Sequence, residues 1–420
     1  MKQHFVIAIL FVLLASCRNS DSADKKFLYS QKMKDDVSYL ADDQLEGRQT
    51  GTPGELKALE YIQSRFENMQ IQPLGTSGYV QEFSFKPKTD PHKEVEFTTN
   101  SASTITGRNV IGFIDNQAQT TVVIGAHYDH LGYGGEGSLY RGEDKAVHNG
   151  ADDNASGVAI MLDLAGKLVE KSQGAEISDN NNYLFIAFSG EEMGLLGSNY
   201  FSKNPTIDSQ NINYMINMDM VGRLKEDKTL AVHGVGTSPM FKQTLNANNE
   251  QFKLVMTESG VGPSDHTSFY LIDVPVLHFF TGQHEDYHKP GDDAEKLNYQ
   301  GMEFISTYIF DLITDLDDNG ELAFRTTKNE SEEVPRFKVG LGVVPDYLYD
   351  GKGMRIDGTR EETPAFNAGI KKGDIVVKLG DSAVSDMMSY MRALSVFEKG
   401  DATNITVKRG DSLIVTTVKF

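Results

Sequence analysis

The chain has 420 residues, of which 39% are hydrophobic and 24% are charged, and its formal net charge is −20. This composition is typical of a soluble globular protein and excludes a disordered or fibrous chain. The length exceeds that of one average domain and predicts two or three domains. Because binding to nucleic-acid phosphates requires a surplus of Lys and Arg, the negative charge argues against such a partner.

The N-terminus resembles a bacterial lipoprotein signal. Residues 1–17 read MKQHFVIAILFVLLASC, in which one lysine precedes an apolar run of signal-peptide length, too short to span a bilayer comfortably. The run ends in Leu-Ala-Ser-Cys, which resembles the lipobox whose cysteine becomes the lipidated first residue. An ordinary signal peptide with an incidental cysteine is the alternative.

We therefore expect a signal peptide over residues 1–16, a membrane anchor on lipidated Cys17 and a polar tether over residues 17–32. The expected location is the bacterial cell envelope outside the cytoplasm, on the periplasmic or the surface face of the outer membrane. Cys17 is the only cysteine of the chain. A disulfide within the chain, a catalytic thiol and cysteine-ligated zinc are therefore excluded.

Apolar spacing predicts helices over residues 33–40 and 55–68, the second after a capping threonine and a first-turn proline, Thr52 and Pro53. Short apolar runs typical of buried strands then occur near residues 121, 182, 212 and 274. A helical pattern over residues 156–171 separates the first two runs. Strands that alternate with helices predict an α/β fold with a mostly parallel, twisted sheet flanked by helices.

Carboxylates or imidazoles follow each predicted strand. In an open α/β sheet, ligands bind beyond the carboxyl ends of the strands, so these side chains are expected to meet there. Two histidines and three carboxylates form a set suited to zinc. Two ions about 3.5–4 Å apart would share one carboxylate as a bridge. One further carboxylate would then be free to take the proton of a metal-bound water and pass it to a leaving amine.

The ordered motifs HYD, GADDNASG, SGEEMGLLGS, NMDM and DYHKPGD resemble those of the bimetallic zinc exopeptidases. This family includes bacterial leucyl aminopeptidases, aminopeptidase Y and glutamate carboxypeptidase. The resemblance covers about residues 33–318 and implies a zinc exopeptidase fold with two zinc ions per chain. It implies two ligand sets that share Asp153 as the bridge: His127, Asp153 and Asp219 for one zinc, and Asp153, Glu192 and His288 for the other.

The same resemblance implies roles for three further residues. Glu191 would be the general base and acid that activates a water bridging the zinc ions. Asp129 would orient His127, because metal-bound imidazoles usually need such a partner. Tyr287 matches the position that hydrogen-bonds the developing oxyanion in the carboxypeptidase branch. The family often has a cis peptide bond after the bridging aspartate.

Other polar residues near the motifs leave alternatives open. Asp152 competes with Asp153 for the bridge, although the spacing to the following Ser-Gly favours Asp153. The loop that contains Asp265 and His266 either lines a substrate pocket or has a structural role only. Three histidines match no ligand position, and we expect each to have a surface or hydrogen-bonding role: His130, His148 and His284.

A polar stretch over residues 326–336 predicts a linker between a zinc aminopeptidase domain, residues 33–325, and a smaller domain, residues 337–420. Within the smaller domain, KVGLGV and TPAFNAGIKKGDIV resemble a PDZ domain. A peptide C-terminus would then pair with a sheet edge and place its carboxylate on the backbone of a loop formed by Gly340, Leu341, Gly342 and Val343. A PDZ-shaped spacer without a ligand is the alternative.

The sequence thus predicts an aminopeptidase that hydrolyses the N-terminal bond of extracytoplasmic peptides. No arginine cluster near the motifs would specify an acidic side chain, which favours an aminopeptidase over a carboxypeptidase. A glutaminyl-cyclase-like acyltransferase is one alternative, but cyclases usually use one zinc ion and lack the first histidine ligand, so His127 argues against it. A non-catalytic scaffold that binds peptides through the PDZ domain is the other, and the presence of all five ligands argues against that.

Overall fold

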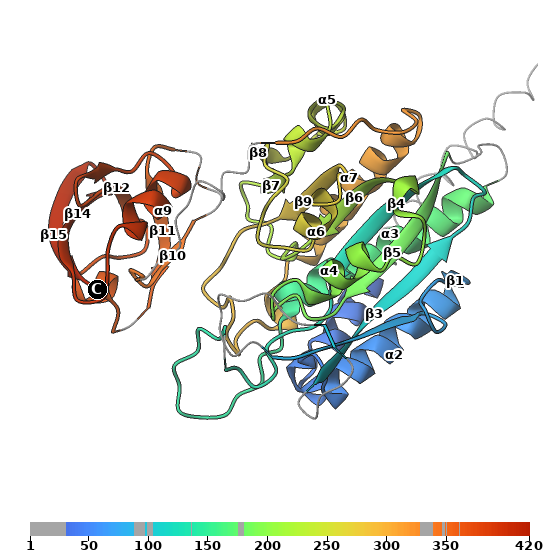
Figure 1. Ribbon diagram of the computed structural model, residues 1–420, viewed down its shortest axis with the longest axis horizontal. Helices are drawn as coiled ribbons and strands as arrows, with labels where there is room; N and C mark the ends of the chain where they lie inside the picture. The colour runs from blue at the N-terminus through green and yellow to red at the C-terminus, as the bar shows by residue number, and fades with distance from the viewer. Residues whose placement is uncertain are drawn as a thin grey trace, which may run out of the picture.

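The computed structural model describes residues 31–87, 97–98, 104–135, 137–174, 180–327, 339–346, 349, 351–360 and 362–420. The predicted signal peptide, Cys17 and most of the predicted tether and linker lie outside these residues. Among the described helices, none has the length and apolar character needed to cross a membrane. The chain forms a larger and a smaller unit (Figure 1), and each has a hydrophobic core of its own.

A nine-stranded mixed sheet forms the centre of the larger unit, in the order β1-β3-β5-β4-β6-β9-β7-β8, with β2 paired to β3. The central strands β5, β4, β6 and β9 are parallel, whereas β3 and β7 pair antiparallel with their neighbours β5 and β9. The predicted parallel arrangement therefore describes the centre of the sheet. The strands are β1 (Gln72–Pro73), β2 (Val80–Phe85), β3 (Ile105–Ile114), β4 (Thr120–His127), β5 (Asn181–Phe188), β6 (Ile212–Met218), β7 (Thr229–His233), β8 (Lys253–Thr257) and β9 (Val276–Phe280).

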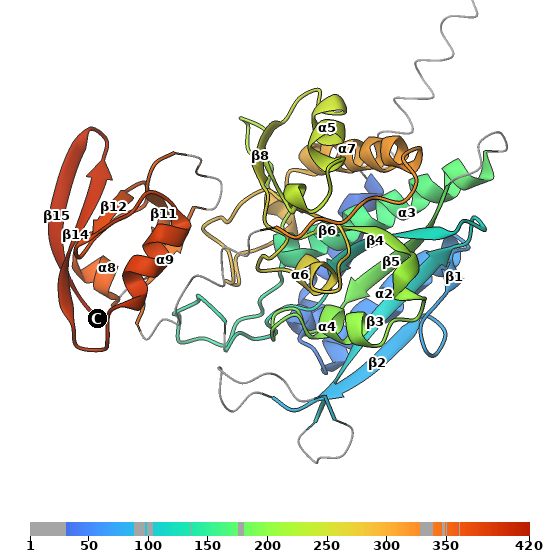
Figure 2. The same cartoon turned by 45° about the horizontal axis from the view of Figure 1, so that its top comes forward.

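Helices cover both faces of this sheet, which gives three layers (Figure 2). On one face lie α2 (Pro53–Asn68), α3 (Gly157–Gln173), α5 (Phe241–Ala247) and α7 (Tyr299–Asp317), and on the other lie α4 (Leu196–Lys203) and α6 (His266–Tyr270). Along β4, Val122 and Ile124 belong to the first core and Val123 to the second. This follows from the alternation of side chains along a strand, and it explains why the central strands are apolar throughout.

The predicted elements of the larger unit are present. Described residues 31–40 are helical, and α2 begins at Pro53 after Thr52, whose side chain accepts a hydrogen bond from the Glu55 amide. The four predicted strands are β4, β5, β6 and β9, and α3 occupies the predicted helix between the first two.

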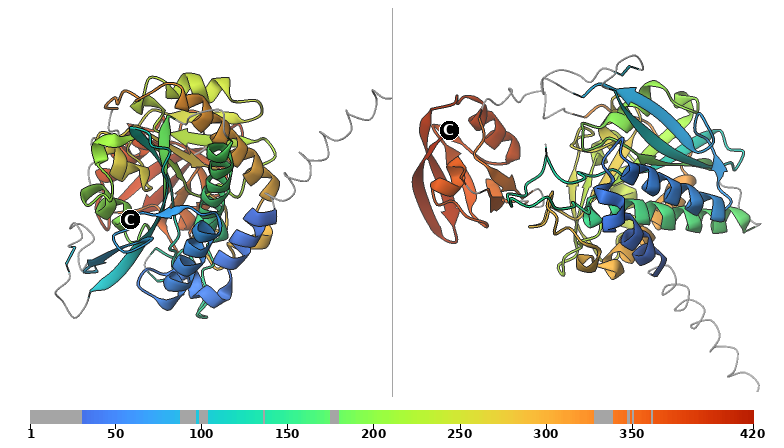
Figure 3. Two further views of the ribbon diagram at one scale, coloured as in Figure 1. Left: turned by 90° about the vertical axis from the view of Figure 1, so that its right-hand side faces the viewer. Right: turned by 90° about the horizontal axis from the view of Figure 1, so that it is seen from below.

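The smaller unit is a separate globule built on an antiparallel sheet in the order β10-β11-β12-β14-β15, with β13 paired to β12 (Figures 1 and 3). Leu341 of the predicted peptide-binding loop is buried in its core, and Gly342 has φ +74°, a backbone conformation that favours glycine. Val343 begins the edge strand. The elements are β10 (Val343–Pro345), β11 (Met354–Thr359), α8 (Pro364–Asn367), β12 (Ile375–Leu379), β13 (Ser382–Ala383), α9 (Met387–Ser395), β14 (Ala402–Arg409) and β15 (Ser412–Lys419).

A fully buried arginine joins the N-terminal segment to the loops at the carboxyl end of the sheet. The Arg48 guanidinium donates hydrogen bonds to the carbonyl oxygens of Tyr128 at 2.8 Å, Asn149 at 2.6 Å and Gly150 at 3.1 Å, and also to that of Leu40. Burial lowers the pKa of Arg48 to about 10, so the side chain stays charged at neutral pH. Arg48 thus satisfies main-chain groups of two loops that flank the predicted site.

We predict that Arg48→Ala lowers the free energy of unfolding by at least about 3 kcal/mol, because several buried carbonyl oxygens lose their donor. Urea unfolding of the full chain measures this effect. Lys57→Ala is the matched control, since Lys57 makes one exposed bond to the Gln44 carbonyl and its loss should stay within about 0.5 kcal/mol. Equal stability of the two variants would contradict the role of Arg48.

A second unusual feature of the core is a pair of stacked histidines. The rings of His266 and His278 are parallel, with centroids 4.4 Å apart. His266 is fully buried, and neither of its ring nitrogens has a hydrogen-bond partner. Burial lowers the pKa of His266 to about 3 from its ordinary value of 6.5. The folded protein therefore keeps His266 neutral at pH values at which the unfolded chain protonates it.

This pKa shift predicts a loss of stability in mild acid. Below pH 6.5 the unfolded chain binds the proton that folded His266 excludes, so the free energy of unfolding falls as the pH falls from 6.5 towards 3. We expect His266→Leu to remove about 2 kcal/mol of the stability difference between about pH 7 and pH 5, as measured by urea unfolding. Phe269→Leu in the same helix controls for altered packing and should keep the wild-type pH dependence. The prediction fails if His266→Leu keeps it too.

Candidate metal centre

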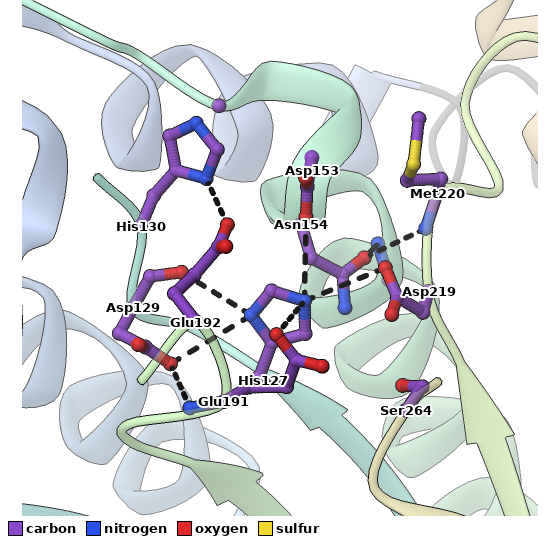
Figure 4. Close-up of polar contacts among 12 residues, drawn as sticks. His127, Asp129, His130, Asp153, Asn154, Glu191, Glu192, Asp219, Met220 and Ser264 are labelled. Atoms are coloured by element: carbon purple, nitrogen blue, oxygen red, sulfur yellow. Dashed lines mark hydrogen bonds and ion pairs between the residues drawn. The ribbon is translucent and has the colours of Figure 1, made fainter. Parts of the chain in front are cut away.

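The predicted ligands come from four neighbouring strand ends. His127 is the last residue of β4, Asp219 directly follows β6, and His288 lies in the loop after β9. Glu191 and Glu192 stand in the turn between β5 and α4. Because the four strands are parallel, their carboxyl ends meet at one edge. Figure 4 shows that His127, Asp219 and the two glutamates converge there.

Asp153 lies between the two predicted histidine ligands. Its Oδ1 is 3.3 Å from His127 Nε2, and its Oδ2 is 3.2 Å from His288 Nε2. Asp153 belongs to a short π-helical turn, Ala151–Ser156, and the bond from Asp153 to Asn154 is a cis peptide. Each oxygen of one carboxylate thus faces a different imidazole, which is the arrangement expected of a bridging ligand.

Asp152 points to other partners. Its Oδ1 accepts hydrogen bonds from the Gly222 amide at 2.6 Å and the Ser156 hydroxyl at 3.1 Å, and its Oδ2 is 3.2 Å from His284 Nε2. The geometry therefore favours Asp153 over Asp152 as the bridge. His284 lies beside Asp152 and outside the two ligand sets.

Asp292 fixes the turn that contains both aspartates. Its Oδ2 accepts hydrogen bonds from the amides of Asp152 at 2.9 Å and Asp153 at 3.0 Å, and its Oδ1 pairs with Arg223 at 2.9 Å. Asp292 lies only a few residues beyond His288 in the chain. The loop after β9 therefore both carries a predicted ligand and positions the bridge.

The two ligand groups have similar spacing. In the first, His127 Nε2 is 3.4 Å from Asp219 Oδ1 as well as 3.3 Å from Asp153. In the second, His288 Nε2 is 3.2 Å from Glu192 Oε2 and from Asp153. Two atoms bound tetrahedrally to one zinc ion at about 2.0–2.1 Å are about 3.4 Å apart. Both groups therefore match the size of a zinc site.

Buried atoms without partners support the same interpretation. His127 Nε2 is buried and has no hydrogen-bond partner, although two carboxylates face it. Burial lowers the pKa of His127, but the charges of Asp219 and Glu191 outweigh this effect and raise the pKa well above its usual value. The carboxylates thus favour a positive charge at this point. Imidazole nitrogen and carboxylate oxygen together are a donor set that suits Zn²⁺.

The pKa values of the two adjacent glutamates are shifted in opposite directions. Burial, with the charges of Asp219 and Glu192, raises the pKa of Glu191 well above its usual value in spite of His127. For Glu192, burial and the charge of Asp153 raise the pKa, but the imidazoles of His288 and His130 outweigh both effects and lower the pKa to about 2. Two carboxylates whose pKa values differ in this way are suited to different tasks. Glu191 is suited to carry a proton and Glu192 to act as an anionic ligand.

Asp129 contacts both the first histidine and the glutamate turn. Its main-chain oxygen is 3.2 Å from His127 Nδ1, whereas its carboxylate Oδ1 is 3.7 Å from that nitrogen. The carboxylate accepts hydrogen bonds from the Glu191 amide at 3.1 Å and from the Thr50 hydroxyl at 3.1 Å. The carbonyl therefore faces the His127 ring at hydrogen-bond distance, and the carboxylate positions the backbone of Glu191.

A cavity of about 140 Å³ opens beside the ligands. Its walls include Met220, Pro263, Phe280 and Tyr287 as well as metal-site carboxylates. The Tyr287 ring stacks on His288 with centroids 3.8 Å apart, and burial raises the Tyr287 pKa well above 10, so its hydroxyl remains a donor. The cavity thus combines an apolar wall with a neutral hydroxyl next to the site.

The structure resolves two of the open alternatives in the sequence. Asp265 and His266 are buried and do not line the cavity, whereas Pro263 of the same loop does. His148 is buried and contacts the Ser138 hydroxyl at 2.7 Å. Two further histidines on the cavity wall, His233 and His278, had no motif or spacing in the sequence that could have identified them.

His130 is the main residue that the sequence interpretation underestimated. It is 1% exposed, and its Nδ1 is 2.7 Å from Glu192 Oε1 (Figure 4). A surface role is therefore excluded. The HYDH pattern, in which a second histidine directly follows the HYD motif, was the only signal that could have indicated this position.

Comparisons with known proteins assign both units. Residues 109–313 match the model of peptidase family M28, and residues 322–420 match that of the PDZ domain. A probable leucine aminopeptidase of Trichophyton verrucosum is 32% identical over 167 residues, 38% of this chain and 42% of that protein. The chain spans about half the length of the curated relatives that it matches.

Two solved structures show the same fold. An aminopeptidase from Aneurinibacillus sp. strain AM-1 has a TM-score of 0.52 and 18% identity, over 71% of this chain and 95% of that one. The glutaminyl cyclase of Porphyromonas gingivalis has a TM-score of 0.52 and 17% identity, over 68% of this chain and 98% of that one. Since a peptidase and a cyclase share the fold, the family match carries the assignment: the chain contains a domain of peptidase family M28 followed by a PDZ domain.

Proposed function

We propose that this protein is a zinc-dependent aminopeptidase that holds two zinc ions and hydrolyses the N-terminal bond of peptides. The central observation is the position of Asp153 between two histidine–carboxylate groups, with a protonatable Glu191 beside them. The family match and the names of the curated relatives support the same activity. His127 stands within reach of Asp153 and Asp219, which favours a two-ion peptidase over a one-ion cyclase.

Two ligand sets would hold the ions: His127, Asp153 and Asp219 for one, and Asp153, Glu192 and His288 for the other. When bound, zinc polarises a carbonyl group and makes water acidic near neutral pH. Glu191 accepts the proton of the attacking water and donates it to the leaving amine. Glu191 has an oxygen 3.9 Å from His127 Nε2 and lines the cavity, where a substrate bond would be accessible.

The remaining cavity residues bind and orient the peptide. The Tyr287 hydroxyl donates a hydrogen bond to the oxygen that becomes negative during attack. Met220 and Phe280 offer an apolar surface to the side chain of the first residue. The negative charge of the surrounding carboxylates attracts the free α-amino group, which accounts for a preference for peptide N-termini.

In this proposal, the N-terminal segment anchors the protein to a membrane and the C-terminal PDZ domain provides a second peptide-binding site. The lipobox-like pattern of residues 1–17 supports an anchor at Cys17 on the extracytoplasmic side of the cell envelope. In the PDZ domain, the loop from Gly340 to Val343 precedes and begins the edge strand β10, where a peptide C-terminus would pair with the sheet.

The decisive test is a panel of dipeptides and aminoacyl-nitroanilides, assayed with and without a chelator, with zinc counted on the same sample. We expect two zinc ions per chain and complete loss of turnover after chelation. Glu191→Gln should keep its zinc and lose about 10²–10⁴-fold in turnover, because the proton carrier is gone. Asp153→Ala should lose zinc as well as activity.

Glu285→Gln, an exposed glutamate in the loop that carries His288, is the control and should retain both zinc and turnover. Wild-type turnover in Glu191→Gln would show that the assigned proton transfer is wrong. Full zinc occupancy without hydrolysis of any peptide would instead favour a non-catalytic scaffold.

For Tyr287→Phe we expect kcat to fall about 10²–10³-fold with little change in KM, since the lost hydrogen bond forms only as negative charge develops on the substrate. Steady-state kinetics on one nitroanilide separates the two constants. Tyr133→Phe removes a hydroxyl bonded to Glu46 on an exposed ring and should behave as wild type. An unchanged kcat in Tyr287→Phe would remove this residue from the proposed mechanism.

A further inference from the structure

His130 belongs to the second ligand group by position. It is buried, and together with Asp153 and Glu192 it offers one potential ligand atom each, all within 4.8 Å of one another. Figure 4 shows the His130 ring directed at the Glu192 carboxylate. The only other such group in the described part of the chain is His127, Asp153 and Asp219. His130 and His127 thus each belong to a compact group with two carboxylates, and Asp153 is a member of both groups.

The contact between His130 and Glu192 is close, but it does not have the direction of a hydrogen bond. His130 Nδ1 and Glu192 Oε1 are 2.7 Å apart, yet both are buried atoms without a hydrogen-bond partner. The second ring nitrogen of His130 has none either. Buried polar atoms are nearly always paired. A cation between them would give both atoms a partner and would hold them about 3.4 Å apart rather than 2.7 Å.

His288 approaches the same carboxylate from its other oxygen. Its Nε2 is 3.2 Å from Glu192 Oε2 and 3.2 Å from Asp153 Oδ2. The rings of His130 and His288 have centroids 5.9 Å apart and planes inclined at 70°. Glu192 therefore lies between two imidazoles that converge on one place.

We propose that His130 is a ligand of the second metal ion, in addition to Asp153, Glu192 and His288. The proposal rests on the two-ion site of the proposed function. Four protein ligands complete the coordination of a zinc ion, whereas three leave a position open for water or substrate. The ion held by His127, Asp153 and Asp219 would then have three protein ligands and an open position, and the other ion would have four protein ligands.

X-ray absorption at the zinc edge tests this assignment directly, because it counts imidazoles around the metal. The site with four protein ligands should fill first, so the protein loaded with one equivalent of zinc should show two imidazoles per ion. With two equivalents, the spectrum should correspond to three imidazoles for every two zinc ions. One imidazole per zinc at both loadings would overturn the proposal while leaving the two-zinc peptidase intact.

Variants give a second readout that is independent of activity. In His130→Ala, competition with a chromophoric chelator should show one zinc bound more than about 100-fold more weakly and the other unchanged, because the loss of a residue that only hydrogen-bonds a ligand costs roughly 10–100-fold. His148→Gln removes a different buried imidazole from the same loop and should keep both affinities. Unchanged affinities in a folded His130→Ala would also overturn the proposal, whereas a wild-type chain that binds no zinc would contradict the proposed function itself.

Discussion

Electrostatic repulsion among four carboxylates is the constraint on which this site depends. Asp153, Glu191, Glu192 and Asp219 converge at one edge of the sheet, largely out of contact with water, where like charges repel strongly. Such a cluster is stable only if positive charge is placed within it. Protons on the histidines supply that charge in the absence of metal, as the raised pKa values of His127 and His288 indicate, and metal ions would supply more of it.

The architecture of the larger unit keeps these charges together. Parallel central strands bring four loops to one edge, and apolar layers on both faces of the sheet hold the strands in register. Buried polar groups then fix the loops: Arg48 binds main-chain oxygens of the segments around Tyr128 and Gly150, and Asp129 holds the glutamate turn. The packing of the core and the hydrogen bonds of these loops therefore offset the unfavourable free energy of repulsion among the carboxylates.

Much of this arrangement could be predicted from the sequence, because strand ends are local features. The apolar runs near residues 121 and 182 identified β4 and β5, and the helical pattern between them predicted their parallel pairing. The antiparallel pairing of β3 with β5 and of β7 with β9 could not be predicted, since the strand beside which each one pairs is distant in the chain. The burial of His130 was missed for a similar reason, because its environment is formed by Glu192, about 60 residues away. The interpretation of residues 1–17 remains a prediction.

The hydrogen bonds from the Asp152 and Asp153 amides to Asp292 have a consequence for biosynthesis. The turn that contains Asp153 is held in place by a carboxylate that the ribosome adds about 140 residues later, shortly after His288. Until that segment is synthesised, the nascent chain contains His127 and all four carboxylates of the site without the residue that fixes the turn around Asp153. A chain that ends before His288 therefore lacks both that predicted ligand and Asp292, the carboxylate that fixes the turn around Asp153.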